Sequence, residues 1–75
     1  MKATQEIARV EVESSSVTSV GYDPELAVLE LDFRNGGVYR YFAVPASVHE
    51  ALMGSESKGA FVSRLVRDVY PFVRV

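Results

Sequence analysis

The sequence predicts a single α+β domain, an antiparallel three- to four-stranded β-meander followed by two α-helices packed on one face of the sheet. In the first half of the chain, apolar residues alternate with polar ones, which is the pattern of half-buried strands. In the second half they recur every three or four residues, as in amphipathic helices. A chain of 75 residues has room for one domain, so we expect a flexible tail over residues 1–9 and a domain over residues 10–75.

Composition excludes several classes of protein. The chain has no Cys and one His, so neither a disulfide nor a Cys/His zinc site can form, and we expect no metal and no cofactor. No apolar run approaches the roughly 20 residues that span a bilayer, and the start lacks a signal-peptide pattern, so we expect a cytoplasmic protein without membrane contact. The net charge is −2, yet residues 1–33 sum to −5 and residues 34–75 to +3. This asymmetry is compatible with a local positive surface on an acidic protein.

The first half of the chain contains four candidate strands separated by turn residues. Residues 10–13 alternate Val and Glu, residues 17–22 form a second candidate, and a turn at residues 23–25 precedes a third over residues 26–33. One side of the third strand is expected to face the core: Ala27, Leu29, Leu31 and Phe33. Its other side carries Leu26, Val28, Glu30 and Asp32. The fourth candidate covers residues 38–43.

Two registers compete at the hairpin over residues 34–37, whose sequence is Arg-Asn-Gly-Gly. A two-residue loop would place Arg40 opposite buried Leu31, leaving a charge in the core without a partner. A three-residue loop with Gly36 in the left-handed conformation places Arg40 opposite Glu30 instead. We predict the second register because it satisfies the charges. It puts two tyrosines on the core face, Tyr39 and Tyr41.

Two helices are predicted in the second half. Pro45 suits the first turn of a helix over residues 45–53, and Gly54 supplies its stop. Ser57 is a good N-cap for a helix over residues 57–69, with Arg64 and Arg67 together on its polar face. Residues 70–75 contain Pro71 and are expected to lie back along the domain. We expect the core to bury Leu29, Leu31, Phe33, Val48, Leu52, Phe61, Leu65 and Val69.

The order of several short motifs resembles that of a known family. A Ser-Ser pair precedes a strand ending in Gly21-Tyr22-Asp23, and Leu29-x-Leu31-x-Phe33, Asn35-Gly36, Tyr39-Arg40-Tyr41, Val44-Pro45 and Ser57-Lys58-Gly59 follow in turn. Over residues 12–73 this order resembles the KTSC domain, a short module found at the C-terminus of some lysyl-tRNA synthetases and as stand-alone bacterial proteins. The resemblance implies no established activity and no catalytic residue. It implies RNA as a ligand only by association with the synthetases.

Basic residues mark one candidate anion-binding surface. At the start of the second helix, Ser57, Lys58 and Gly59 combine free backbone donors with an ammonium group, although the same residues also suit a simple helix cap. Arg64 and Arg67 would extend such a surface along a phosphate backbone. Arg40 either joins them or forms a separate patch on the sheet.

Two tyrosines on the fourth strand have alternative roles. Tyr39 and Tyr41 would stack on RNA bases if their face of the sheet were open. We favour a core role, because the predicted register places both rings under the helices.

The sequence therefore supports two functions of different classes. The first is a non-enzymatic module that binds RNA, structured or tRNA-like, through Lys58, Arg64, Arg67 and Arg40. The alternative is a protein-interaction domain that uses the exposed sheet face, where Val28, Val38 and Phe42 lie among charged residues. No acid–base pair stands at a recognisable spacing, so we predict that the domain is not an enzyme.

Overall fold

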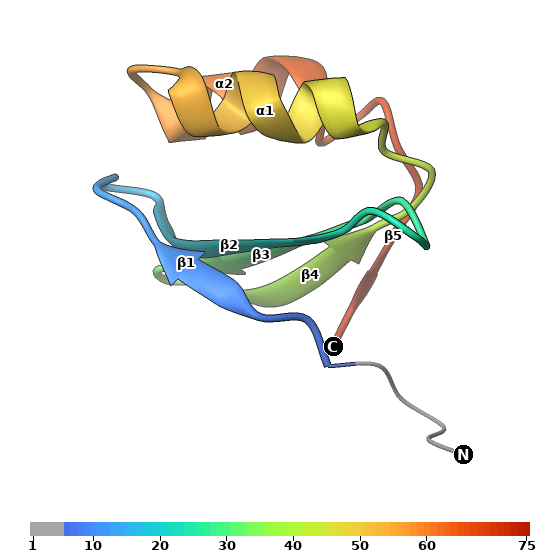
Figure 1. Cartoon of the computed structure of the whole chain (residues 1–75). Coiled ribbons are helices and arrows are strands. Elements are labelled where there is room, and N and C mark those ends of the chain that lie inside the picture. The colour runs from blue at the N-terminus through green and yellow to red at the C-terminus, as the bar shows by residue number, and fades with distance from the viewer. Residues whose placement is uncertain (1–5) are drawn as a thin grey trace.

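The computed structural model describes residues 6–75, which form one antiparallel sheet with two helices on one of its faces (Figure 1). Within these residues the sheet has five strands in chain order: β1 (Arg9–Glu11), β2 (Val17–Asp23), β3 (Val28–Phe33), β4 (Gly37–Tyr41) and β5 (Phe72–Arg74). Helices α1 (Ala46–Gly54) and α2 (Lys58–Leu65) lie between β4 and β5 in the chain. The predicted α+β meander with both helices on one face is confirmed, and β5 is added at its edge.

The β3–β4 hairpin has the predicted register. Glu30 lies opposite Arg40, and Phe33 lies opposite Gly37. The left-handed residue is Gly37, with φ of 89°, and not Gly36 as predicted. Both positions are glycine, so the local sequence does not distinguish them. The positive φ accounts for glycine at position 37, where a Cβ would also lie 3.0 Å from Nη2 of Arg74 in β5.

β3 begins two residues later than predicted, because residues 24–27 form a turn. The Asp23 carboxylate accepts hydrogen bonds from the backbone N–H groups of Glu25 and Leu26, as expected for an Asx turn. Ala27 then adopts a left-handed conformation, with φ of 56°, and its carbonyl accepts a hydrogen bond from the Val44 N–H. Ala27 therefore closes the turn and is not a core-facing strand residue.

The segment before β1 packs on the sheet. A Cβ on Gly21 would lie 2.7 Å from the carbonyl oxygen of Ala8, so glycine is what lets this segment approach β2. β1 begins at Arg9, whose guanidinium lies 3.4 Å from the Glu30 carboxylate. Residues 1–5 of the expected tail lie outside the described residues.

The core lies between the sheet and the helices. The predicted core residues Leu29, Leu31 and Leu52 are fully buried. Phe33, Val48 and Phe61 pack against the core and are partly buried. The prediction is wrong for Leu65 and Val69, which are 52% and 56% exposed. The remaining buried members of the core are Val17, Val20, Tyr41, Val44, Val62 and Val66.

The end of α2 explains this error. The helix stops at Leu65 and buries Val62 and Val66, one turn apart, instead of continuing to residue 69. Beyond it the chain turns back, and the Pro71 carbonyl accepts a hydrogen bond from the Phe42 N–H (2.9 Å). β5 then pairs with the free edge of β4. Strand pairing at this edge requires the chain to leave the helix early, which local helical periodicity does not reveal.

α1 follows the prediction closely. It begins after Pro45 and ends at Gly54. The Tyr22 hydroxyl donates a hydrogen bond to the Val44 carbonyl (2.6 Å) just before the helix, and the Tyr22 ring stacks on His49 at 4.7 Å. His49 is thus a half-buried packing residue. Neither helix in residues 6–75 has the length and apolar content needed to cross a bilayer.

Candidate functional site

The start of α2 is a capped helix end in contact with a loop. The Ser57 hydroxyl accepts a hydrogen bond from the Ala60 N–H (3.2 Å), so the predicted N-cap is confirmed. The Lys58 ammonium donates to the Ser55 carbonyl (2.8 Å), at the end of α1. A Cβ on Gly59 would lie 2.7 Å from the Ser16 hydroxyl oxygen, which explains the glycine. These residues border a polar hollow of about 320 Å³.

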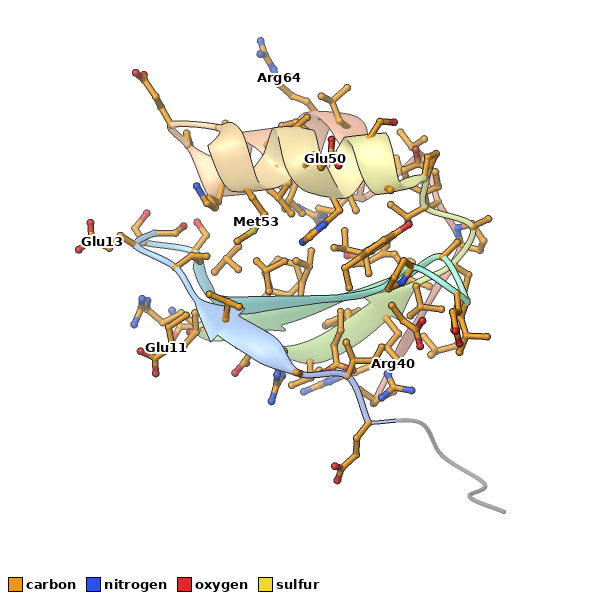
Figure 2. The ribbon with its side chains drawn as sticks, in the orientation of Figure 1. Glu11, Glu13, Arg40, Glu50, Met53 and Arg64 are labelled. Carbon is orange, nitrogen blue, oxygen red and sulfur yellow. The ribbon has the colours of Figure 1, made fainter. Side chains whose placement is uncertain are left out.

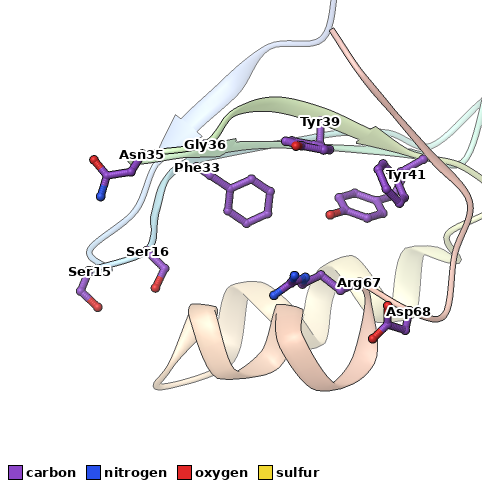
Figure 3. A pocket seen from close by; sticks show the side chains of 10 residues that line it. Ser15, Ser16, Phe33, Asn35, Gly36, Tyr39, Tyr41, Arg67 and Asp68 are labelled. Atoms are coloured by element: carbon purple, nitrogen blue, oxygen red, sulfur yellow. The ribbon is translucent and has the colours of Figure 1, made fainter.

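Arg64 and Arg67 do not share a surface, contrary to the prediction. Arg64 is in the last turn of α2 and points away from the sheet (Figure 2). Arg67 follows the end of the helix, where helical spacing no longer applies, and it faces the space between α2 and the sheet (Figure 3). The early end of α2 therefore separates the two guanidinium groups.

Arg40 lies on the opposite face of the sheet and forms a separate patch (Figure 2). Its Nε is 2.6 Å from the carboxylate of Glu30, a buried side chain that also contacts Arg9. The ion pair predicted from the register is confirmed. Val28, which we expected on an exposed apolar patch here, is only 6% exposed. Val38 and Phe42 are partly exposed, and Val73 of β5 lies beside Arg40 on this face, which therefore carries both paired charges and apolar side chains.

Tyr39 and Tyr41 lie on the helix-covered face, as predicted, but differ in exposure. Tyr41 is 3% exposed and belongs to the core. Burial raises the pKa of its phenol, an effect that the nearby Arg67 guanidinium opposes. Tyr39 remains half-buried. Phe33 meets the Tyr39 ring edge-on at 5.6 Å, and Phe72 lies 5.5 Å from it on the β5 side.

The partly open Tyr39 ring belongs to a cleft of about 510 Å³, which we call the aromatic cleft (Figure 3). Rings from β3, β4 and β5 form its apolar side, and the β1–β2 loop and the segment after α2 supply polar groups. Its lining residues are Ser15, Ser16, Phe33, Asn35, Gly36, Tyr39, Tyr41, Arg67, Asp68 and Phe72.

Arg67 is the basic group of the aromatic cleft. Among the described residues, its guanidinium makes no hydrogen bond or ion pair, whereas Arg34 donates to the Ser14 carbonyl and Lys58 to that of Ser55. Figure 3 shows the Arg67 side chain crossing the cleft below the rings. The site thus sets a free cation against an aromatic surface, an arrangement suited to a planar ligand with a negative charge.

A model of the KTSC domain family matches residues 13–70, most of the chain. The chain belongs to the KTSC domain family. The crystal structure of a KTSC domain protein from Yersinia pestis matches the fold with a TM-score of 0.91 and 34% sequence identity, covering 93% of this chain and 99% of that one. An uncharacterized protein from Stutzerimonas stutzeri is 44% identical over 79% of this chain and 83% of its own length. A lysine–tRNA ligase from Nostoc sp. is 32% identical over 80% of this chain and 11% of the ligase.

Several residues of the aromatic cleft in this KTSC domain were not predicted from sequence. Ser15 and Ser16 come from the loop between β1 and β2, and Asn35 comes from the turn between β3 and β4. Phe72 reaches the cleft because β5 pairs with β4, opposite Tyr41. Arg74, opposite Tyr39 on the same strand pair, shares this face of the sheet. The alternation of Phe72 and Arg74 is the sequence signal that indicates a strand here. A strand of three residues after Pro71 is too short for its pattern to be distinguished from that of a loop.

The described residues of this KTSC domain contain no group of three or more His, Asp or Glu side chains placed to hold a metal ion. The functional groups of the aromatic cleft are hydroxyls, a carboxamide, a guanidinium and the Asp68 carboxylate. These groups can bind a polar ligand through hydrogen bonds and charge.

Proposed function

We propose that this KTSC domain is a non-enzymatic module that binds RNA, including tRNA-like RNA, and that the aromatic cleft is its principal contact surface. The observation that carries the proposal is the Arg67 guanidinium, which has no hydrogen bond or ion pair within residues 6–75 and faces the half-buried Tyr39 ring. Proteins that bind unpaired nucleic acid combine cations for the phosphates with aromatic rings for the bases. The aromatic cleft offers both within one hollow.

The family context supports RNA over other anionic ligands. A segment similar to this domain occurs in lysine–tRNA ligases, enzymes named for acting on tRNA. That segment is 11% of the ligase, which fits an accessory module better than a catalytic centre. The proposal also implies a cytoplasmic location, because a protein that binds tRNA has to share its compartment.

The start of α2 remains in the proposal as a secondary contact. Ser15 and Ser16 line both the aromatic cleft and the hollow at Lys58. An extended ligand can therefore run along the loop over residues 14–16, which we call the serine loop, from the aromatic cleft to this hollow. Lys58 would exchange its bond to the Ser55 carbonyl for a phosphate oxygen. Arg64 and Arg40 are outside this path, because they point to other surfaces.

The non-enzymatic part of the proposal rests on the chemistry of the cleft. General acid–base catalysis at neutral pH needs a group whose pKa lies near 7. The raised pKa of Tyr41 keeps its phenol protonated well above neutral pH, and a guanidinium stays charged throughout. Neither of these two groups transfers protons at neutral pH, and Asp68 is the one carboxylate among the described residues that line the cleft, so it has no second carboxylate or His there to form an acid–base pair.

Titration of total tRNA at two salt concentrations, about 50 and 200 mM, tests the proposal. We expect binding that weakens with salt. Arg67→Ala should weaken it and lower the log–log salt slope by about one unit, because one phosphate contact is lost. Arg64→Ala removes the same charge from the outer side of α2 and is the matched control. Absence of tRNA binding at low salt, or equal losses in the two variants, would contradict the proposal.

A protein-interaction domain is the second candidate. Exposed apolar side chains favour it, and most of them lie in the C-terminal part of the chain: Leu65, Val69, Phe72, Val73 and Val75. Val73 lies opposite Arg40, so it is on the charged face of the sheet that the sequence predicts as the interaction surface. Concentration-dependent association or capture of a protein partner that is abolished by Val73→Asp, with tRNA binding absent, would favour this candidate.

A further inference from the structure

The aromatic cleft has the size and shape of a site for one nucleotide. Its volume of about 510 Å³ falls within the range of small-ligand pockets, roughly 300 to 1,000 Å³. A nucleic-acid base can stack on the aromatic side of the cleft only if it is unstacked from the neighbouring bases of its own strand. From this geometry we infer that the aromatic cleft takes one unpaired nucleotide, with its base on Tyr39 and its phosphate on Arg67. This inference rests on the proposed function and specifies its ligand.

Tyr39, and not Tyr41, is the platform for the base. Tyr41 is 3% exposed, so a base has no access to its ring. The Tyr39 ring lies along the sheet and is seen nearly edge-on in Figure 3, so one of its faces is turned to the cleft. Phe33 stands at 78° to this ring and Phe72 at 48°. These two neighbours fix the ring and form walls on either side of it, as a stacking site requires.

The anion end of the site is set by Arg67. Its side chain comes from the segment after α2, across the cleft from Tyr39, so a nucleotide between them meets the ring with its base and the guanidinium with its phosphate. A guanidinium pairs with phosphate oxygens in a bidentate manner. The Ser15 and Ser16 hydroxyls and the Asn35 amide line the same cleft and can donate to the sugar or to the base edge.

The inference predicts a preference for single strands that depends on the Tyr39 ring. We expect an unstructured RNA decamer to bind more tightly than the duplex of the same sequence. Tyr39→Leu should lower the affinity for the decamer by roughly 5- to 150-fold, whereas Tyr39→Phe, which keeps the ring, should leave it nearly unchanged. Adenosine 5′-monophosphate alone should shift the NMR signals of Tyr39 and Arg67. Far-UV circular dichroism and thermal unfolding establish that each variant is folded.

The outcomes separate this inference from the proposed function. If RNA binds but the duplex binds as well as the decamer, and Tyr39→Leu and Tyr39→Phe behave alike, the one-nucleotide inference is overturned while RNA binding stands. If neither the decamer nor tRNA binds at low salt, the proposed function fails and the inference with it.

Discussion

The contact between the loop over residues 14–16 and the start of α2 borders the polar hollow at Lys58, and it can be tested by two small substitutions. In Gly59→Ala the added Cβ would lie 2.7 Å from the Ser16 hydroxyl oxygen and 3.1 Å from Ser16 Cβ. Overpacking of this kind costs about 1 to 3 kcal/mol. Exchanging Gly for Ala within a helix contributes about 1 kcal/mol in the opposite direction. In the parent, Gly59→Ala should therefore be neutral or destabilising by up to about 2 kcal/mol.

The effect of Gly59→Ala on stability should change sign when the Ser16 side chain is removed. In a Ser16→Gly background nothing opposes the new methyl group, so Gly59→Ala should stabilise the domain by up to about 1 kcal/mol. The coupling free energy of the double-mutant cycle is then about 1 to 3 kcal/mol. Urea unfolding followed by far-UV circular dichroism measures all four variants. An equal effect of Gly59→Ala in both backgrounds would refute the close approach of the loop to the helix.

Two further predictions concern the core. Leu31→Ala, at a fully buried position, should lower the free energy of unfolding by about 2 to 5 kcal/mol, and a loss below 1 kcal/mol in urea unfolding would contradict its place in the core. The raised pKa of Tyr41 means that above about pH 10 the unfolded chain loses its phenol proton while the folded domain retains it, so stability should fall as pH rises through this range. Tyr41→Phe should flatten this decline in unfolding measurements between about pH 8 and 11, and an unchanged slope would contradict the assignment.

The register of the β3–β4 hairpin could be predicted from sequence because the charges of its own residues distinguish the two possible registers. Arg40 needs a carboxylate partner, and only one of the two registers supplies Glu30. The same reasoning placed both tyrosines on the helix side. It could not identify Gly37 as the left-handed residue, because either of two adjacent glycines can adopt a positive φ.

The aromatic cleft could not be predicted, because it depends on where α2 ends. Apolar periodicity continues to Val69 and predicts a helix that carries Arg64 and Arg67 on one face. Pairing of β5 with β4 ends the helix at Leu65, and Arg67 then turns toward the sheet. This competition between helix extension and strand pairing is a tertiary effect. The cleft it creates is lined by segments that are distant in sequence.

Mapping the RNA contact by NMR is the most direct test of the claim that the aromatic cleft binds RNA. In a titration of the isotopically labelled protein with a short unstructured RNA, the largest shifts should occur at Tyr39, Phe72 and the Nε–Hε group of Arg67. Signals of Arg64, on the outer side of α2, and of Arg40, on the opposite face of the sheet, should stay near their starting positions. Shifts that cluster at Arg64 or Arg40 while the cleft signals remain unchanged would contradict the account.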